Sequence, residues 1–212
     1  MDLSNMRSNY DKGALRRGDL ADDPIQQFTK WFDEACQSKL VEPNAVSLAT
    51  ADPQGRPLLR TVLVKQYDAR GFVFFTNLES RKARHIESNP NVCILFPWVA
   101  LERQVIVCGT ASRVSTAETL AYFVKRPLDS QIGAWASKQS SAISSRKLLE
   151  MEWQQMKQKF SDGKVPLPSF WGGFRVEPAT IEFWQGRSSR LHDRFLYTKQ
   201  PNNSWTIERL CP

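Results

Sequence analysis

The sequence predicts a mainly β protein, an antiparallel barrel with flanking helices. Five β-prone runs follow one another between residues 45 and 114, divided by turn residues and by one short helical segment. Successive short strands favour antiparallel pairing over the parallel sheet of a dinucleotide-binding domain. The ten glycines form neither a GxGxxG motif nor a P-loop, so neither of these nucleotide-binding sites has motif support.

The composition is that of an ordinary globular protein. The chain has 212 residues, of which 41% are hydrophobic and 24% are charged, so it can bury a substantial core. Its 29 Lys and Arg against 22 Asp and Glu give a net charge of +7, which favours anionic partners. Because the basic residues are dispersed in short pairs, small phosphorylated ligands are favoured over nucleic acid.

Cysteine and histidine usage limits the possible metal sites. The cysteines are Cys36, Cys93, Cys108 and Cys211, at spacings that match no zinc motif. Three of them lie in apolar contexts, so we expect reduced core thiols. The sequence has only two histidines, His85, which we expect at the surface of a polar helix, and His192. Two histidines are too few for a multi-histidine metal site.

The amino-terminal residues predict an arm and a location. Residues 1–21 are polar and aperiodic, so we expect a mobile arm that precedes a single domain over residues 22–212. The first 13 residues lack an apolar signal segment, and no run approaches the roughly 18 apolar residues of a membrane span. We therefore expect a cytoplasmic protein with no membrane partner. Whether Arg16 and Arg17 bind a second anion stays open.

The remaining elements follow from local patterns. Asp23 before Pro24 predicts a helix start, and Phe28, Phe32 and Ala35 then share one face. Strands are expected over residues 45–51, 58–67, 71–77, 91–98 and 103–114, and again from residue 170 onward. Helices are expected over residues 80–89, 116–125 and 142–160. In the last of these, Leu149, Trp153, Met156 and Phe160 follow helical spacing, and we interpret them as packing residues.

Residues 181–197 predict two strands joined by a polar turn. Arg190, His192 and Arg194 alternate with Leu191 and Asp193, so on a regular strand the two arginines and the histidine would project together and attract anions. A solvated strand edge is the alternative. Trp184 just upstream favours a flat, phosphorylated ligand instead.

Three other segments carry candidate anion ligands. Arg81 and Lys82 lie in the first turn of the helix expected over residues 80–89, and Asn77 or Ser80 is its expected cap. Positive side chains are unfavourable at a helix start unless they bind an anion. A bound phosphate would therefore explain them, and a solvated basic turn is the alternative.

Arg60 and Lys65 are five residues apart on one strand, so a bulge, a strand end or a subunit boundary is needed for both to reach one site. Tyr122 and Arg126 are four apart on an expected helix and would share a face, which exposed helix polarity also explains.

The motifs SRKA, RPLDSQIGAW, SKQSS, VPLPSFWGGFR and FWQG…RLHDR resemble those of the pyridoxamine 5'-phosphate oxidase family over nearly the whole chain. The resemblance implies an FMN-binding split β-barrel that works as a homodimer with FMN at the interface. It also implies oxidation of pyridoxamine and pyridoxine 5'-phosphates by O2 to pyridoxal 5'-phosphate, with release of H2O2, in vitamin B6 metabolism.

The same resemblance implies the site residues. FMN would be held by Arg60, Thr61, Val62, Leu63, Val64, Lys65, Phe75, Thr76, Arg81, Lys82, Gln104, Gln139, Ser140, Trp184 and Arg194. The substrate would be bound by Arg7, Ser8, Asn9, Tyr10, Lys65, Tyr122, Arg126, Ser130, Arg190, Leu191 and His192, with Arg190 and His192 as the catalytic pair. Two alternatives remain: a split-barrel flavoprotein with another substrate, and a non-catalytic binder of flavin, pyridoxal phosphate or RNA.

Overall fold

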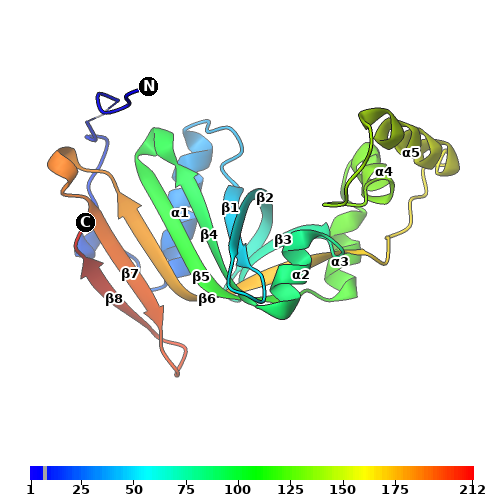
Figure 1. Ribbon diagram of the computed structural model, residues 1–212. Helices are drawn as coiled ribbons and strands as arrows, with labels where there is room; N and C mark the ends of the chain where they lie inside the picture. Colours follow the sequence, from blue (N-terminus) through cyan, green and yellow to red (C-terminus); the bar gives the residue numbers. More distant parts are fainter. Residues whose placement is uncertain (7–8) are drawn as a thin grey trace.

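A computed structural model describes residues 1–6 and 9–212. It shows a six-stranded antiparallel barrel with a two-stranded extension (Figure 1). The barrel strands are β1 (Ala45–Ala51), β2 (Pro57–Asp68), β3 (Gly71–Asn77), β4 (Asn91–Trp98), β5 (Arg103–Arg113) and β6 (Trp171–Gln185). They lie in the order β3-β2-β1-β4-β5-β6, and pairing of β3 with β6 closes the barrel. The predicted fold class is confirmed.

The long strand β6 belongs to both parts of the sheet. Its first residues, from Trp171 to Val176, pair with β3, and residues from Thr180 to Gln185 pair with β7 (Asp193–Lys199), which pairs with β8 (Trp205–Leu210). The pairing of β5 with β6 shifts register between Cys108 and Gly109, at the point where β6 passes from its β3-paired part to its β7-paired part. A Cβ on Gly109 would lie 1.9 Å from the Glu177 carbonyl oxygen, so only glycine permits this close approach.

Helix α1 (Pro24–Gln37) packs on the barrel as predicted. The Asp23 carboxylate caps it by accepting hydrogen bonds from the Ile25 and Gln26 amides at 2.8 and 2.9 Å. Phe28 is fully buried, and its ring lies 4.9 Å from Phe72 of β3. Apolar side chains of α1 and of the barrel strands therefore form one continuous core.

Four helices follow the first strands along the chain: α2 (Arg81–Ser88), α3 (Thr116–Phe123), α4 (Leu128–Ala136) and α5 (Arg146–Lys159). Short 3-10 turns occur elsewhere, at η1 (Arg17–Asp19), η2 (Val99–Leu101) and η3 (Ser188–Arg190). Helix α4 was not expected from the sequence. Figure 1 shows α4 and α5 together at the end of the molecule opposite to β7 and β8.

Three expectations about burial are wrong. No residue of α5 is buried and Leu149 is 39% exposed, because the outer side of this helix has no barrel strand against it; only Phe160, just past the helix, is buried. The cysteines are free thiols but do not belong to the core: Cys36 and Cys211 are exposed, and Cys93 and Cys108 are half-buried opposite each other on β4 and β5. His85, expected at the surface, is half-buried, with its Nδ1 3.2 Å from the Thr50 hydroxyl.

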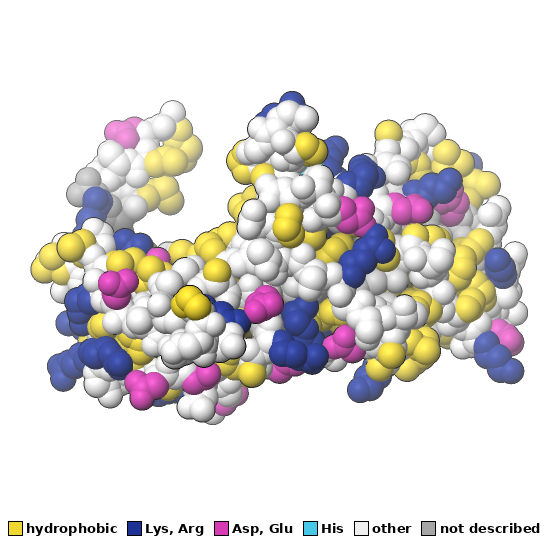
Figure 2. Space-filling model, turned by 90° about the horizontal axis from the view of Figure 1, so that it is seen from below, with side chains coloured by type: hydrophobic (Ala, Val, Ile, Leu, Met, Phe, Trp, Pro, Cys, Tyr) yellow, Lys and Arg dark blue, Asp and Glu magenta, His cyan; other side chains and the backbone are white. Residues whose placement is uncertain are grey.

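The surplus of positive charge is divided among several places. On the face drawn in Figure 2, Lys and Arg side chains gather in separate clusters, with acidic and uncharged side chains between them. Such a face presents local anion sites and not one continuous basic surface.

Candidate functional site

A cavity of about 650 Å³ opens between strands β2 and β3 and helices α3 and α4. Its lining includes many of the residues that the sequence predicted: Arg60, Thr61, Val62, Leu63, Lys65, Phe75, Thr76, Lys82, Tyr122, Arg126, Ser130 and Gln139. The size and the mixture of polar and aromatic walls are those of a cofactor or substrate site.

A bulge in β2 brings Arg60 and Lys65 to the same cavity. The pairing of β2 with β3 shifts register between Val64 and Gln66, so Lys65 is the extra residue that interrupts the alternation of faces. Of the three explanations that the spacing of Arg60 and Lys65 left open, the structure shows the bulge. Val64 is directed into the barrel core and does not line the cavity.

The start of α2 places a buried ammonium group in the cavity wall. Ser80 caps the helix, and the Lys82 Nζ donates to the Gln139 Oε1 at 2.8 Å and to the Thr76 hydroxyl at 3.1 Å. Burial, followed by the charge of Arg60, lowers the pKa of Lys82 from 10.5 to about 8. These partners are neutral, so the charge of Lys82 lacks a counter-ion among them.

Two guanidinium groups in the cavity wall are incompletely paired. Among the described residues, the Arg60 Nη2 and the Arg126 Nη1 are buried atoms without a hydrogen-bond partner. Burial lowers the pKa of both side chains, and Arg81 adds to the effect at Arg60. Buried donors on cations are costly unless an anion accepts from them. The two unpaired guanidinium nitrogens therefore favour an anionic ligand, such as a phosphate, in this cavity.

An aromatic stack holds the second guanidinium group. The Phe75 ring lies 4.1 Å from Tyr122 and 5.4 Å from Trp171, with Tyr122 and Trp171 6.1 Å apart, so the three rings contact one another. The Arg126 guanidinium lies 4.7 Å from the Trp171 ring centre. Helix α3 ends at Phe123, so the prediction that Tyr122 and Arg126 share a helix face is wrong. Trp171 was not predicted as a site residue, although the aromatic run SFWGGF that contains it was a usable signal.

Some predicted ligands lie outside the cavity lining. Arg81 is exposed and lines a neighbouring hollow with Arg84 and His85. Ser140 is exposed with φ of 71° next to Gln139. Asn9 is exposed, and Arg7 and Ser8 lie outside the described residues.

The other predicted residues form a second group at the turn between β6 and β7. The His192 ring lies 4.6 Å from the Trp184 ring, and Tyr10 lies 5.9 Å from each of them. Gln104 of β5 is paired with Trp184 in the sheet. The Arg187 amide donates to the His192 Nδ1 at 3.1 Å, so a neutral imidazole there carries its proton on Nε2.

The common strand face predicted for this group is wrong. Arg190 belongs to η3 and has φ of 61°, Leu191 and His192 follow in the turn, and β7 begins only at Asp193. Arg190 and Leu191 are exposed. Arg194 is held by Glu182, at 2.7 and 3.1 Å, and by the Cys211 carbonyl at 2.8 Å.

Within a single chain, the cavity residues and the residues of the β6–β7 turn do not meet. The β6–β7 turn and helix α4 lie at opposite ends of the molecule (Figure 1), and none of the residues of the turn lines the cavity. The described residues contain no group of three His, Cys, Asp or Glu side chains that could hold a metal ion. Nor does this part of the chain include a helix with the length and apolarity to cross a membrane.

The closed barrel, its hairpin extension and the cation-lined cavity define a split-barrel protein with an anion-receptive site. Residues 32–160 match the family model described as pyridoxamine 5'-phosphate oxidase, and residues 171–212 match the model described as the pyridoxine 5'-phosphate oxidase C-terminal dimerisation region. The chain belongs to the pyridoxamine 5'-phosphate oxidase family, and the resemblance predicted from its motifs is confirmed.

Curated relatives extend the match over the full length. The chain is 58% identical to the pyridoxine/pyridoxamine 5'-phosphate oxidase of Rippkaea orientalis, with all of both chains covered. It is 57% identical to the protein of the same name from Escherichia fergusonii, with 99% of this chain and 96% of that one covered.

Solved structures give the same fold. PhzG from Burkholderia lata, in complex with tetrahydrophenazine-1-carboxylic acid, superposes with a TM-score of 0.88 at 28% identity and covers 97% of this chain and 100% of its own. A pyridoxamine 5'-phosphate oxidase-related, FMN-binding protein from Nostoc punctiforme superposes with a TM-score of 0.70 at 18% identity and covers 91% and 100%. The likeness of the second structure concerns the fold alone.

Proposed function

We propose that this protein oxidises pyridoxamine 5'-phosphate and pyridoxine 5'-phosphate to pyridoxal 5'-phosphate, with FMN as cofactor and O2 as electron acceptor. H2O2 is released, and ammonia leaves from the amine substrate. The observation that carries the proposal is a pair of half-buried guanidinium groups, Arg60 and Arg126, each with a buried nitrogen that has no partner among the described residues, in one cavity. Identity of 57–58% over the whole length to proteins named for this activity supports it.

The residues around Lys82 fit the phosphate of FMN. Arg60 and Lys82 offer two cations, Thr76 and Gln139 offer polar atoms beside them, and Arg81 adds charge nearby. When bound, FMN supplies the redox chemistry by accepting a hydride equivalent from the substrate and passing electrons to O2. The chain's own task is to bind and orient both ligands.

A second set in the same cavity fits the substrate phosphate. Lys65 and Arg126 supply positive charge, and Tyr122 and Ser130 supply hydroxyl donors. The Trp171 and Phe75 rings fix Tyr122 and Arg126 from one side, so these donors are oriented before the ligand arrives.

We assign the β6–β7 turn to the same reaction, contributed by a second copy of the chain. The carboxyl-terminal match to a dimerisation region supports a homodimer, and a twofold axis would provide two equivalent sites with FMN at the interface. Trp184 and Arg194 would then contact the flavin. Arg190 and His192 would orient the reacting carbon, and Tyr10 would help to cover the substrate.

The proposed hydride transfer needs no strong acid or base from the protein. A hydride leaves carbon with its bonding electrons, so no strong carbon base is needed, and positioning together with charge balance is the main contribution of the protein. Arg190 and the His192 ring, which the Arg187 amide orients, suit that contribution. The cytoplasmic location predicted from the sequence remains part of this proposal.

The visible spectrum of the purified protein, recorded under anaerobic conditions, tests the proposal. We expect a flavin band that bleaches on addition of pyridoxine 5'-phosphate and returns with air while pyridoxal 5'-phosphate accumulates. A flavin band that does not respond would favour a flavoprotein with another substrate, or a carrier. Absence of any band after incubation with FMN would refute the proposal.

A further inference from the structure

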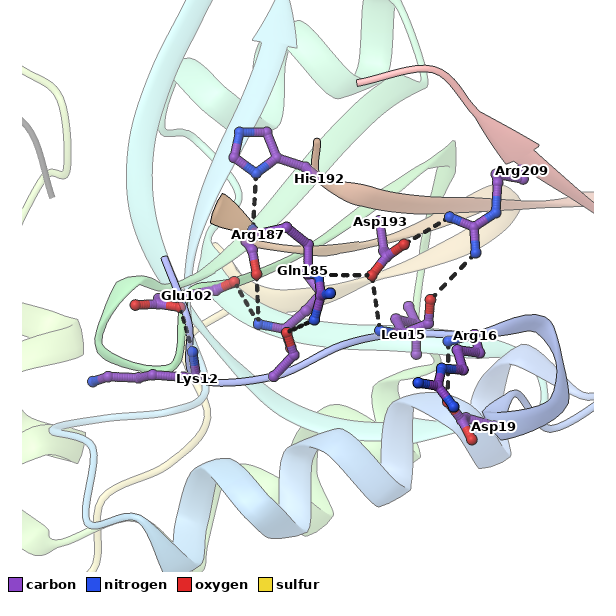
Figure 3. Close-up of polar contacts among 12 residues, drawn as sticks. Lys12, Leu15, Arg16, Asp19, Glu102, Gln185, Arg187, His192, Asp193 and Arg209 are labelled. Carbon is purple, nitrogen blue, oxygen red and sulfur yellow. Dashed lines mark hydrogen bonds and ion pairs between the residues drawn. The ribbon is translucent and has the colours of Figure 1, made fainter. Parts of the chain in front are cut away.

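Residues 12–15 are fastened to the body of the protein by hydrogen bonds along their backbone (Figure 3). The Lys12 amide donates to the Glu102 carboxylate at 3.0 Å, and the Leu15 amide donates to the Asp193 Oδ2 at 3.1 Å. The Gly13 carbonyl accepts from the Arg187 Nη1 at 2.9 Å. Leu15 is only 3% exposed, so this short segment is anchored by an apolar side chain as well.

The Asp193 carboxylate is the centre of this attachment. It also accepts from the Arg209 Nη1 at 2.7 Å and lies 3.6 Å from the Arg187 Nε, with 15% of its side chain exposed. Burial alone would raise the pKa of Asp193, but the hydrogen bonds from Arg209 and Leu15 and the charge of Arg187 outweigh it and lower the pKa. The group is therefore a carboxylate at neutral pH.

Arg187 connects the anchored segment to the turn that carries His192. Its side chain contacts Gly13 and Asp193, and its own amide donates to the His192 Nδ1 (Figure 3). One residue thus holds the amino-terminal segment and orients the imidazole ring. Neither Arg187 nor Asp193 was singled out by the sequence, and neither lines the cavity.

Tyr10 lies three residues before Gly13 and packs directly on the same turn. Its ring is 5.9 Å from the rings of Trp184 and His192. A Cβ on Gly186 would lie 2.6 Å from the Tyr10 Cδ2, so the absence of a side chain there allows this contact. The position of Tyr10 is therefore fixed by the attachment of the residues that follow it.

We propose that Asp193 and Arg187 are positioning residues, which hold residues 12–15 and thereby keep Tyr10 against His192 and Trp184 for reaction of the phosphorylated pyridine. This inference rests on the proposed function. Neither residue touches the reacting atoms in this assignment. Loss of the attachment should weaken capture of the substrate and leave the redox step largely intact.

The test uses full-length holoenzyme and a double-mutant cycle with pyridoxine 5'-phosphate as substrate. We expect Asp193→Asn to raise KM about tenfold with kcat changed less than about twofold, because a polar clamp on the covering segment is lost. Arg187→Lys should act in the same direction, since one ammonium cannot reproduce both contacts. In the Tyr10→Ala background, Asp193→Asn should have no further effect.

Asp52→Asn is the matched control, because the Asp52 side chain is also 15% exposed and paired with an arginine, Arg56. Independent kinetic effects of Asp193→Asn and Tyr10→Ala, or equal effects of Asp52→Asn and Asp193→Asn, would overturn the inference.

Trypsin cleavage after Lys12 and Arg16 supplies a readout that needs no turnover: it should be faster in Asp193→Asn, and an unchanged rate would also overturn the inference. A wild-type protein without oxidase activity would refute the proposed function instead.

Discussion

At the residue scale, the site is defined by cations whose partners inside the chain are insufficient. Arg60 and Arg126 each keep a buried donor atom without an acceptor among the described residues, and Lys82 is surrounded by neutral oxygens. Such groups reduce the stability of the protein without ligand. A bound phosphate ester would accept hydrogen bonds from these groups and balance their charge, so the proposed function links ligand binding to stability.

The lowered pKa of Lys82 makes this linkage depend on pH. Unfolded lysine keeps its ordinary pKa of 10.5, whereas folded Lys82 titrates at about 8. Below pH 8 both states carry the proton, and the penalty of the buried charge is present in full. Between pH 8 and 10.5 the folded state has released it, so the contribution of Lys82 to the stability of the apoprotein rises with pH through this window.

FMN affinity should show the opposite trend, because a phosphate dianion is bound best by charged Lys82. We expect the dissociation constant to increase by up to about tenfold per pH unit above pH 8, measured by quenching of flavin fluorescence. Lys82→Met should bind FMN more weakly and lose this pH dependence. An unchanged pH profile in that variant would show that another group titrates.

At the element scale, capping interactions set the positions of the ligand-bearing helices. The Ser80 hydroxyl accepts from the Ala83 amide at the start of α2, directly before Arg81 and Lys82. A side-chain cap of this kind contributes roughly 1 kcal/mol. Its loss should therefore disturb the flavin phosphate site as well as the helix.

We expect Ser80→Ala to lower stability by about 1 kcal/mol and to weaken FMN retention. Ser145→Ala is the matched control, because Ser145 caps α5, whose residues lie outside the cavity lining of β2, β3, α3 and α4. It should leave FMN retention unchanged. Equal retention of FMN in both variants, measured after dialysis, would contradict this role of the cap.

Elements with strong local signals were predictable from the sequence, and contacts between distant segments were not. Asp23 and Pro24 predicted the start of α1, and β-prone runs divided by turn residues predicted most of the strands. The turn at Arg190 was assigned to a strand because its positive φ has no glycine to signal it. The contact of Arg126 with Trp171 joins the turn after α3 to β6 across 45 positions, which periodicity cannot reveal.

At the scale of the whole molecule, the proposed function requires that each chain hold two incomplete halves of a site. The cavity offers the cations for two phosphates, and the β6–β7 turn, at the other end, offers Trp184, Arg190 and His192. The dimerisation region matched by residues 171–212 contains that turn. A homodimer in which the turn of one copy faces the cavity of the other therefore accounts for both halves.

A hybrid dimer tests this account most directly. One copy carries Arg126→Ala in the cavity and the other carries Arg190→Ala in the turn, with two affinity tags to purify the mixed dimer. Each mutant homodimer should have little activity on pyridoxine 5'-phosphate. The hybrid should recover about half of the wild-type turnover, because one of its two shared sites contains neither substitution. A hybrid no more active than the mutant homodimers would contradict the shared site.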